Sequence, residues 1–268
     1  MIGYVSTLKT LNWSAPSTGR GALAVWRRNF LVWRKLMWPS LLFNFGEPLI
    51  YLVGLGYGLG GFIGSMADLP YLTFLATGIL ASSAMNTATI EGLYSVYSRM
   101  VPQQTYEGML ATPLTVDDIV AGEMLWCASK GLISSVAILI VASLMGAITA
   151  PQSLLCLPVF LLVGFCFGGP ALMVAAISRS FDFFAYYMTL IIAPMFMLSG
   201  VFFPVSALPQ ALQDVVMFLP LTHAVLLIRP LAAGLPLTDA ALHIGVLLAY
   251  AVVGFYVAVL LLRRRLIT

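Results

Sequence analysis

The chain has 268 residues and a formal net charge of +3; 61% of its residues are hydrophobic, 9% are charged, and its mean hydropathy is +1.00. Soluble domains carry roughly 25% charged residues, so this composition excludes an ordinary water-soluble domain. The long apolar runs are continuous, whereas transmembrane β-strands alternate apolar and polar residues. We therefore expect an all-α polytopic membrane protein, because a helix satisfies every backbone polar group within its own segment.

The first part of the chain is polar and then amphipathic. Residues 1–18 contain Ser, Thr and Pro and are expected to form a loosely ordered cytoplasmic tail without a cleavable signal. Within residues 19–38, Trp26 and Trp33 lie on one apolar helical face, and Arg27 and Arg34 lie beside it. This pattern predicts an interfacial helix with its indoles at headgroup depth and its cations on anionic lipid. The alternative is a soluble amphipathic helix that packs on a partner.

Six apolar segments are long enough to span a membrane as helices. They occupy residues 39–59, 70–94, 119–148, 154–177, 183–203 and 240–262. Residues 204–238 are also apolar but contain five prolines, which a continuous helix does not tolerate. We expect short re-entrant helices there, since irregular backbone at membrane depth survives only inside protein or beside water.

The distribution of cations predicts the orientation. Lys and Arg residues precede the first span and follow the second, fourth and last spans, while the loops at 60–69 and 149–153 contain none. By the positive-inside rule, both termini and the central loop at 99–123 are cytoplasmic. The expected location is a bacterial inner membrane.

Motifs for catalysis are absent from the sequence. It contains no GxxxxGK[ST] phosphate loop, no HExxH and no GxSxG, and its three cysteines lie singly in apolar segments. We therefore expect no catalytic residue, no metal and no cofactor on this chain.

Three ionisable residues, Glu47, Glu91 and Lys130, lie within apolar segments. A charge in hydrocarbon costs at least about 2.5 kcal/mol, so such residues usually face one another or a wet cavity. One interpretation is an ionic cluster that rearranges during transport. The other is a static pair that ties spans together, or side chains that extend to the headgroups.

Three residues of the broken segment, Pro204, His223 and Arg229, are candidates for a re-entrant or substrate-exit region. His223 and Arg229 can contact a polar headgroup, or they can cap short helices. The sequence leaves both interpretations open.

Three stretches resemble the ABC-2 type export permeases. The central loop has the typical Glu-Gly-x-Leu-x-Thr-Pro core as Glu107, Gly108, Leu110, Thr112 and Pro113. The stretches LSGVFFPVSALPQALQ (198–213) and LPLTHAVLLIRPL (219–231) are also similar to this family, and with EPLIYLVGLGYGLG (47–60) they look closest to its NodJ type, the membrane subunit of nodulation-factor exporters.

The resemblance implies a division of labour between subunits. Residues 39–268 would form the transmembrane domain, which pairs as a homodimer with two ATPase subunits of the NodI type that carry ATP and Mg²⁺. A coupling helix at about 103–111 would meet the ATPase. The residues implied there are Gln103, Gln104, Glu107, Gly108, Leu110, Thr112 and Pro113. The acidic pair Asp117 and Asp118 is expected to meet basic groups on the same partner.

The expected function is the permease subunit of an ATP-driven exporter, which is not itself an enzyme. Its substrate is expected to be amphipathic, a lipid-linked or lipo-oligosaccharide that leaves the cytoplasm or inner leaflet in contact with membrane lipids, with no role for nucleic acid. Two alternatives remain: a multidrug or antibiotic exporter built on the same plan, and an ion-driven secondary transporter that uses the charges within the spans.

Overall fold

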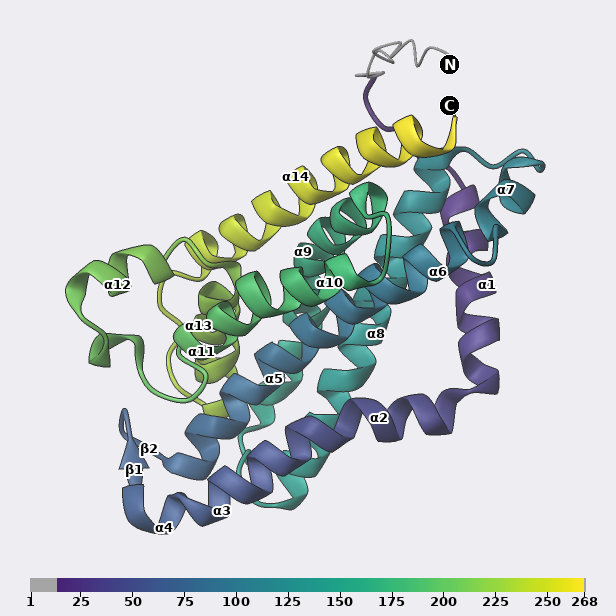
Figure 1. Cartoon of the computed structure of the whole chain (residues 1–268). Coiled ribbons are helices and arrows are strands. Elements are labelled where there is room, and N and C mark those ends of the chain that lie inside the picture. The colour runs from purple at the N-terminus through teal and green to yellow at the C-terminus, as the bar shows by residue number, and fades with distance from the viewer. Residues whose placement is uncertain (1–13, 268) are drawn as a thin grey trace.

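A computed structural model of the chain describes residues 14–267, except for the side chains of Leu41, Phe43, Asn44, Phe45 and Glu47. The described chain is almost entirely helical (Figure 1). Residues 1–13, most of the expected tail, lie outside the described residues, as does the side chain of Glu47.

The chain begins with two helices that meet at a sharp corner. Helix α1 (Gly21–Lys35) ends at Leu36, whose backbone leaves helical geometry, and α2 (Met37–Ile50) sets off in a new direction (Figure 1). The helical path then continues through η1 (Tyr51–Leu55), α3 (Gly56–Gly58) and α4 (Gly60–Ile63). The corner separates the expected interfacial helix from the expected first span.

A two-stranded hairpin and a long broken helix follow. Strands β1 (Ser65–Met66) and β2 (Leu69–Pro70) pair antiparallel. Next come α5 (Tyr71–Ile90), a π-helical turn η2 (Glu91–Ser95), α6 (Val96–Met100) and the short α7 (Thr105–Leu110). The helix α5–η2–α6 therefore runs past the expected end of the second span and brings Arg99 to the end of the bundle where α7 lies (Figure 1).

The remaining elements complete the bundle. They are α8 (Val116–Leu144), η3 (Pro151–Leu155), α9 (Cys156–Ile177), α10 (Asp182–Tyr187), η4 (Met188–Ile192), α11 (Ala193–Leu198), η5 (Val205–Ala207), α12 (Gln210–Val216), α13 (Pro220–Ala233) and α14 (Ala240–Leu266). Helices α12 and α13 meet at an angle of 88°. The proline-broken segment thus folds into short helices, as its prolines predict.

Helix α9 lies at the centre, in contact with α5, α8, α13 and α14. Small residues permit this close packing: a Cβ added at Gly164 would lie 2.5 Å from the Cα of Ala128 on α8, and one at Gly169 would lie 2.8 Å from the backbone of Gly254 on α14. Helix interfaces in membranes favour such residues because lipid gives apolar side chains no drive to associate.

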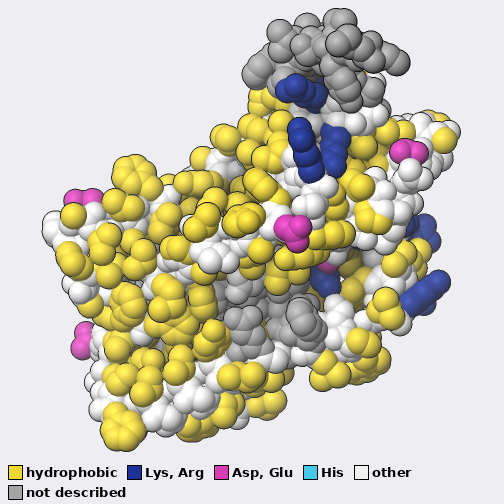
Figure 2. All heavy atoms as spheres, viewed as in Figure 1, with side chains coloured by type: hydrophobic (Ala, Val, Ile, Leu, Met, Phe, Trp, Pro, Cys, Tyr) yellow, Lys and Arg dark blue, Asp and Glu magenta, His cyan; other side chains and the backbone are white. Residues whose placement is uncertain are grey.

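Within residues 14–267, three helices meet the length and hydropathy expected of a membrane span: Val116–Leu144, Pro151–Ile177 and Ala240–Leu266. The bent pair α12–α13 meets the same length and hydropathy only when its two helices are taken together. The segments Pro48–Ile63 and Asp182–Leu198 are shorter apolar helices. Figure 2 shows the surface that follows from this composition. Hydrophobic side chains cover most of the visible face, and Lys and Arg gather at the end that holds α1, α7 and the C-terminus.

Candidate functional site

The loop between the second and third expected spans carries a short, exposed helix at one end of the bundle (Figure 1). Gln104, in left-handed backbone geometry with φ +50°, precedes α7. Beyond α7, Thr112 donates to the carbonyl of Met109 at 2.6 Å, and Pro113 follows, which disfavours helical geometry for the residue before it. The helix occupies 105–110, inside the range 103–111 expected for a coupling helix.

The two faces of α7 differ. Glu107 and Gly108 are exposed, as are the preceding Gln103 and Gln104, whereas Tyr106 is fully buried. Burial, followed by the charge of Glu123, raises the pKa of Tyr106 well above its usual value, so its hydroxyl stays protonated. One face of α7 can therefore meet a partner while the other presses on the protein interior.

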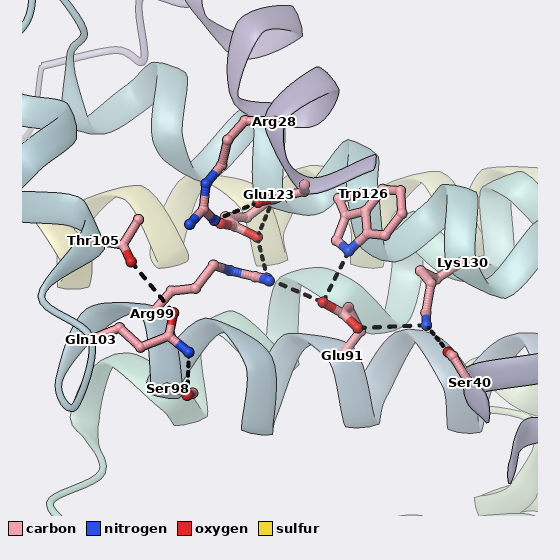
Figure 3. A network of polar contacts seen from close by, with 11 residues as sticks. Arg28, Ser40, Glu91, Ser98, Arg99, Gln103, Thr105, Glu123, Trp126 and Lys130 are labelled. Carbon is pink, nitrogen blue, oxygen red and sulfur yellow. Dashed lines mark hydrogen bonds and ion pairs between the residues drawn. The ribbon is translucent and has the colours of Figure 1, made fainter. Parts of the chain in front are cut away.

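Beneath α7, four charged side chains form a buried network (Figure 3). Arg99 Nη2 donates to Glu91 Oε1 at 3.1 Å and to Glu123 Oε2 at 2.7 Å. Lys130 Nζ lies 3.9 Å from Glu91 Oε2. The charges of two cations and two carboxylates therefore balance in this site. Each of the four side chains is at most 11% exposed.

The network extends to the first two helices. Asn29 of α1 donates to Glu123 at 3.0 Å and accepts from Arg28. Lys130 donates to Ser40 of α2 at 2.9 Å (Figure 3). Trp126 of α8 donates to Glu91 at 2.9 Å. The network thus joins α1, α2, α5–η2–α6 and α8, and the charges of Glu123 and Arg99 also act on Tyr106 of α7.

The local structure around Glu91 is a π-helical turn, since η2 begins at this residue. A π-helical turn inserted in an α-helix is uncommon and is frequently found at functional sites. Gly92, the next residue, packs so closely on α9 that an added Cβ would lie 2.6 Å from the Cβ of Ala171. The wide turn and the missing side chain together hold this stretch against the centre of the bundle.

Of the three intramembrane charges singled out in the sequence, Glu91 and Lys130 lie together, and the side chain of Glu47 lies outside the described residues. Sequence reasoning missed Arg99, Glu123 and Asn29 as members of the network. Arg99 was used only to predict orientation. Its position at the end of an apolar helix, like that of Glu123 at the start of another, is the signal that a pairing partner was needed.

The acidic pair at the start of α8, Asp117 and Asp118, makes its contacts within the chain itself. Asp118 caps α8 through a reciprocal bond with Thr115 and also accepts from the backbone N–H of Gly19 at 2.8 Å. Asp117 accepts from the backbone N–H of Ser17 at 2.8 Å and pairs with Arg263. The expectation that Asp117 and Asp118 face an ATPase is therefore wrong, because both carboxylates are buried in contacts within the chain. Residues 14–19 are held there instead of forming a loose tail.

The tryptophans of α1 pack on the protein. Trp26 donates to Ser129 at 2.9 Å, Trp33 donates to Ser40 at 3.0 Å, and the Trp33 ring meets that of Trp126 edge to face at 5.9 Å. Trp26 and Trp33 are both half-buried, and the predicted position of α1 at the headgroups stays a prediction. Arg27 and Arg34 remain exposed on the outer side of α1.

The candidates in the broken segment lie at the opposite end of the bundle from α7 (Figure 1). Pro204 precedes η5, while His223 and Arg229 lie on α13. His223 Nδ1 lies 2.8 Å from His243 Nδ1 of α14, and its Nε2 lies 2.8 Å from the carbonyl of Met217. Arg229 instead binds α5 and the turn after α11, so the structure does not bring it together with His223.

Comparisons with known proteins identify the family of the chain. The model of the family described as ABC-2 type transporter matches residues 21–231. The chain belongs to the ABC-2 type transporter family. It is a multi-pass membrane subunit for transport and not itself a catalyst, and membership implies an ABC ATPase partner.

Similar relatives cover nearly the whole chain. Nodulation protein J of Rhizobium leguminosarum bv. viciae is 47% identical over 94% of this chain and 97% of the relative. Nodulation protein J of Rhizobium meliloti is 45% identical over 94% and 96%, and the inner membrane transport permease YadH of Escherichia coli is 20% identical over 84% and 86%. No solved structure matches the chain significantly.

Proposed function

We propose that the chain is the permease subunit of an ABC exporter for an amphipathic lipo-oligosaccharide or lipid-linked oligosaccharide. Its relatives named Nodulation protein J, at 41–47% identity over nearly the full chain, support this substrate class over others. The family supports a pair of such subunits working with two copies of a separate ATPase of the NodI type, which would bind ATP and Mg²⁺.

The observation that carries the mechanism is the contact between α7 and the buried charge network. A partner that presses on exposed Glu107 also moves Tyr106, which is packed beside Arg99 and Glu123. Those two residues connect α6 with α8, and Asn29 connects α8 with α1. Movement of α7 is thereby passed to three helices at once, which is what an ATP-driven change of the membrane part requires.

The geometry at this junction favours rearrangement. Among the described residues, the buried atoms Tyr106 Oη, Arg99 Nε and Glu123 Oε1 have no hydrogen-bond partner. Unsatisfied buried polar groups are costly, so an arrangement that pairs them would gain hydrogen bonds that this one lacks. We propose that the ATPase cycle switches the network between such arrangements.

The arrangement across the membrane follows the same proposal. Six spans, formed by α2–α4, α5–α6, α8, α9, α10–α11 and α14, with α12 and α13 as re-entrant helices, would place α7 and both termini in the cytoplasm of a bacterial inner membrane. The basic side chains at that end support this orientation (Figure 2). A substrate with acyl chains suits the apolar flanks, because its tails can stay in lipid while the sugar crosses.

The test is to purify the tagged protein from native membranes and to measure which ATPase accompanies it and how fast that ATPase hydrolyses ATP. Glu107→Arg is expected to lower the retained ATPase at least about tenfold, because it reverses an exposed charge at the contact. Asp214→Arg is the matched control: Asp214 is an exposed acid on α12, at the other end of the bundle.

The outcomes separate the alternatives. If the wild type and Glu107→Arg retain the same amount of ATPase, α7 is not the site of contact with the ATPase. Transport that persists without any ATPase would favour an ion-driven secondary transporter, which would draw on charges such as Glu91 and Lys130. A drug-resistance profile that changes on deletion, with no change in oligosaccharide export, would favour a multidrug exporter on the same plan.

A further inference from the structure

At the end of the bundle opposite α7, a partly open cavity of about 370 Å³ lies between α13, α5 and the turn after α11. Its walls are mainly apolar, formed by residues such as Phe74, Val225 and Leu235. Four polar side chains also line it: Arg229 of α13, Ser199 at the end of α11, Ser206 and Thr238. Arg229 is the charged one among them. The cavity is separate from the buried charge network.

Arg229 is held firmly in one position. Its Nε donates to Thr77 Oγ1 at 3.1 Å, and its Nη2 donates to the carbonyls of Gly200 at 2.7 Å and Phe74 at 3.3 Å. The guanidinium carbon also lies 3.7 Å from the centre of the Phe74 ring. These contacts fix the plane of the guanidinium but leave Nη1 without a hydrogen bond to any described residue.

The positive charge of Arg229 has no acidic counterpart within the part of the chain that the structure describes. All four partners around the guanidinium are neutral, and no carboxylate lies within ion-pair distance. Two acidic residues, Asp68 and Asp239, are next in sequence to residues that line the cavity. Both are exposed, and neither pairs with Arg229. A partly buried cation without an acidic partner is costly, so it points to an anionic ligand from outside the chain.

Ser199 provides a second, independent sign of a ligand. Its side chain is fully buried, and its hydroxyl has no hydrogen-bond partner among the described residues. Buried hydroxyls are normally paired, since an unpaired one loses its bonds to water without replacement. A hydroxyl and a guanidinium N–H on the wall of one cavity can donate to oxygens of the same anion.

We propose that Arg229 and Ser199 form a binding site for the phosphate group of an amphipathic molecule. Arg recognises phosphate through charge-assisted hydrogen bonds, and Nη1 is the guanidinium nitrogen of Arg229 that is left to donate one. The apolar walls accept the glycerol and upper acyl carbons that adjoin such a phosphate. The phosphate belongs either to a resident bilayer lipid or to a transported amphiphile, and the inference does not depend on which substrate the exporter moves.

The test is native mass spectrometry of the delipidated full-length protein with dioleoyl-phosphatidylglycerol or with dioleoylglycerol, which lacks the phosphate head. The wild type is expected to retain phosphatidylglycerol selectively, and Arg229→Gln is expected to weaken this retention roughly tenfold or more. Arg179→Gln is the control, since Arg179 is an exposed cation at the α7 end of the chain. Arg179→Gln should retain phosphatidylglycerol as strongly as the wild type does.

A further variant keeps the proposal testable if Arg229→Gln does not fold. Ser199→Ala removes only the unpaired hydroxyl and is expected to weaken retention several-fold. Equal retention of the two lipids by the wild type, or retention of phosphatidylglycerol by Ser199→Ala that matches the wild type, would overturn the proposal.

The source of the phosphate is decided in the complex with the ATPase. A phosphatidylglycerol molecule that stays bound through ATP hydrolysis identifies a resident lipid. One that is released with each round of hydrolysis identifies the phosphate group of a transported molecule.

Discussion

Arg99 is the residue on which the buried network depends, because it bridges Glu91 and Glu123 from two different helices. Arg99→Met removes the ion-pair partner of Glu123 and leaves Glu91 paired with Lys130 alone among the described residues. Loss of one partner from a buried ion pair costs roughly 3–5 kcal/mol, so we expect a large drop in thermal stability in detergent. The double variant Arg99→Met with Glu123→Gln restores the charge balance and should recover a substantial part of the loss.

The control for this comparison is Arg27→Met on the exposed side of α1. Surface substitutions away from such features usually stay within about 0.5 kcal/mol. A double variant that is less stable than Arg99→Met alone, by an amount equal to the effect of Glu123→Gln in the wild type, would show that Arg99 and Glu123 act independently.

Tyr106 permits a sharper prediction about which part of a side chain matters. Its ring is fully buried under α7, whereas its hydroxyl has no hydrogen-bond partner among the described residues. Tyr106→Phe should therefore change the stability by less than about 1 kcal/mol, because it removes an unsatisfied polar group. Tyr106→Ala should cost roughly 3–5 kcal/mol through the cavity it leaves.

The two Tyr106 variants also separate packing from signalling. For each variant we would measure the thermal stability and the stimulation of ATP hydrolysis by substrate. If Tyr106→Phe unfolds as easily as Tyr106→Ala, the hydroxyl is bonded in the folded protein and the junction is more rigid than described.

At the scale of elements, α1 depends on a close crossing with α8. A Cβ added at Gly122 would lie 2.6 Å from the carbonyl oxygen of Ala22 and 2.6 Å from the Cβ of Val25. Gly122→Ala must therefore push the two helices apart, at a cost of roughly 1–3 kcal/mol. We expect faster amide hydrogen exchange over residues 21–35 and weaker coupling of ATP hydrolysis to transport.

Gly245→Ala on α14 is the matched control, because nothing lies within 4 Å of its added Cβ. Its exchange rates over residues 21–35 should equal those of the wild type. The same rates in Gly122→Ala would mean that α1 can move away from α8 without loss, and that it does not transmit motion from the network.

The positions of the helices could be predicted largely from the sequence, because the length of an apolar run and its prolines act locally. Helix α8 begins three residues before the expected 119, and the broken segment forms α12 and α13. The contacts between distant residues could not be predicted in this way. Asp117 meets Ser17 and Arg263, which are 100 and 146 positions away, and no periodicity in the sequence reports such pairs.

Only part of the candidate site was predicted, because sequence patterns report local features and not contacts between distant residues. The exposed motif around Glu107 is contiguous in the chain, so it could be recognised from its residues. The network below it is assembled from α1, α2, η2, α6 and α8, and of its members only Glu91 and Lys130 stood out in the sequence as charges within apolar runs. Arg99 and Glu123 lie close enough to the ends of their helices to resemble ordinary loop charges.

At the scale of the whole molecule, the two ends of the bundle differ in a way that predicts its orientation. Helix α7, the described part of the N-terminal segment and the C-terminus gather at one end, and the β1–β2 hairpin and α12 lie at the other (Figure 1). Asp68 in the hairpin and Gly108 in α7 are both exposed. Cysteines placed at these two positions should therefore be separated by the membrane.

The experiment uses a variant in which Cys127, Cys156 and Cys166 are replaced by alanine, all three being buried and free. In intact spheroplasts, a membrane-impermeant maleimide should label Asp68→Cys at least about tenfold faster than Gly108→Cys, because the positive-inside rule places α7 in the cytoplasm. Permeabilisation should make the two rates similar. Fast labelling of Gly108→Cys before permeabilisation would place α7 outside the cell, where no ATPase could reach it, and the exporter mechanism would fail with the orientation.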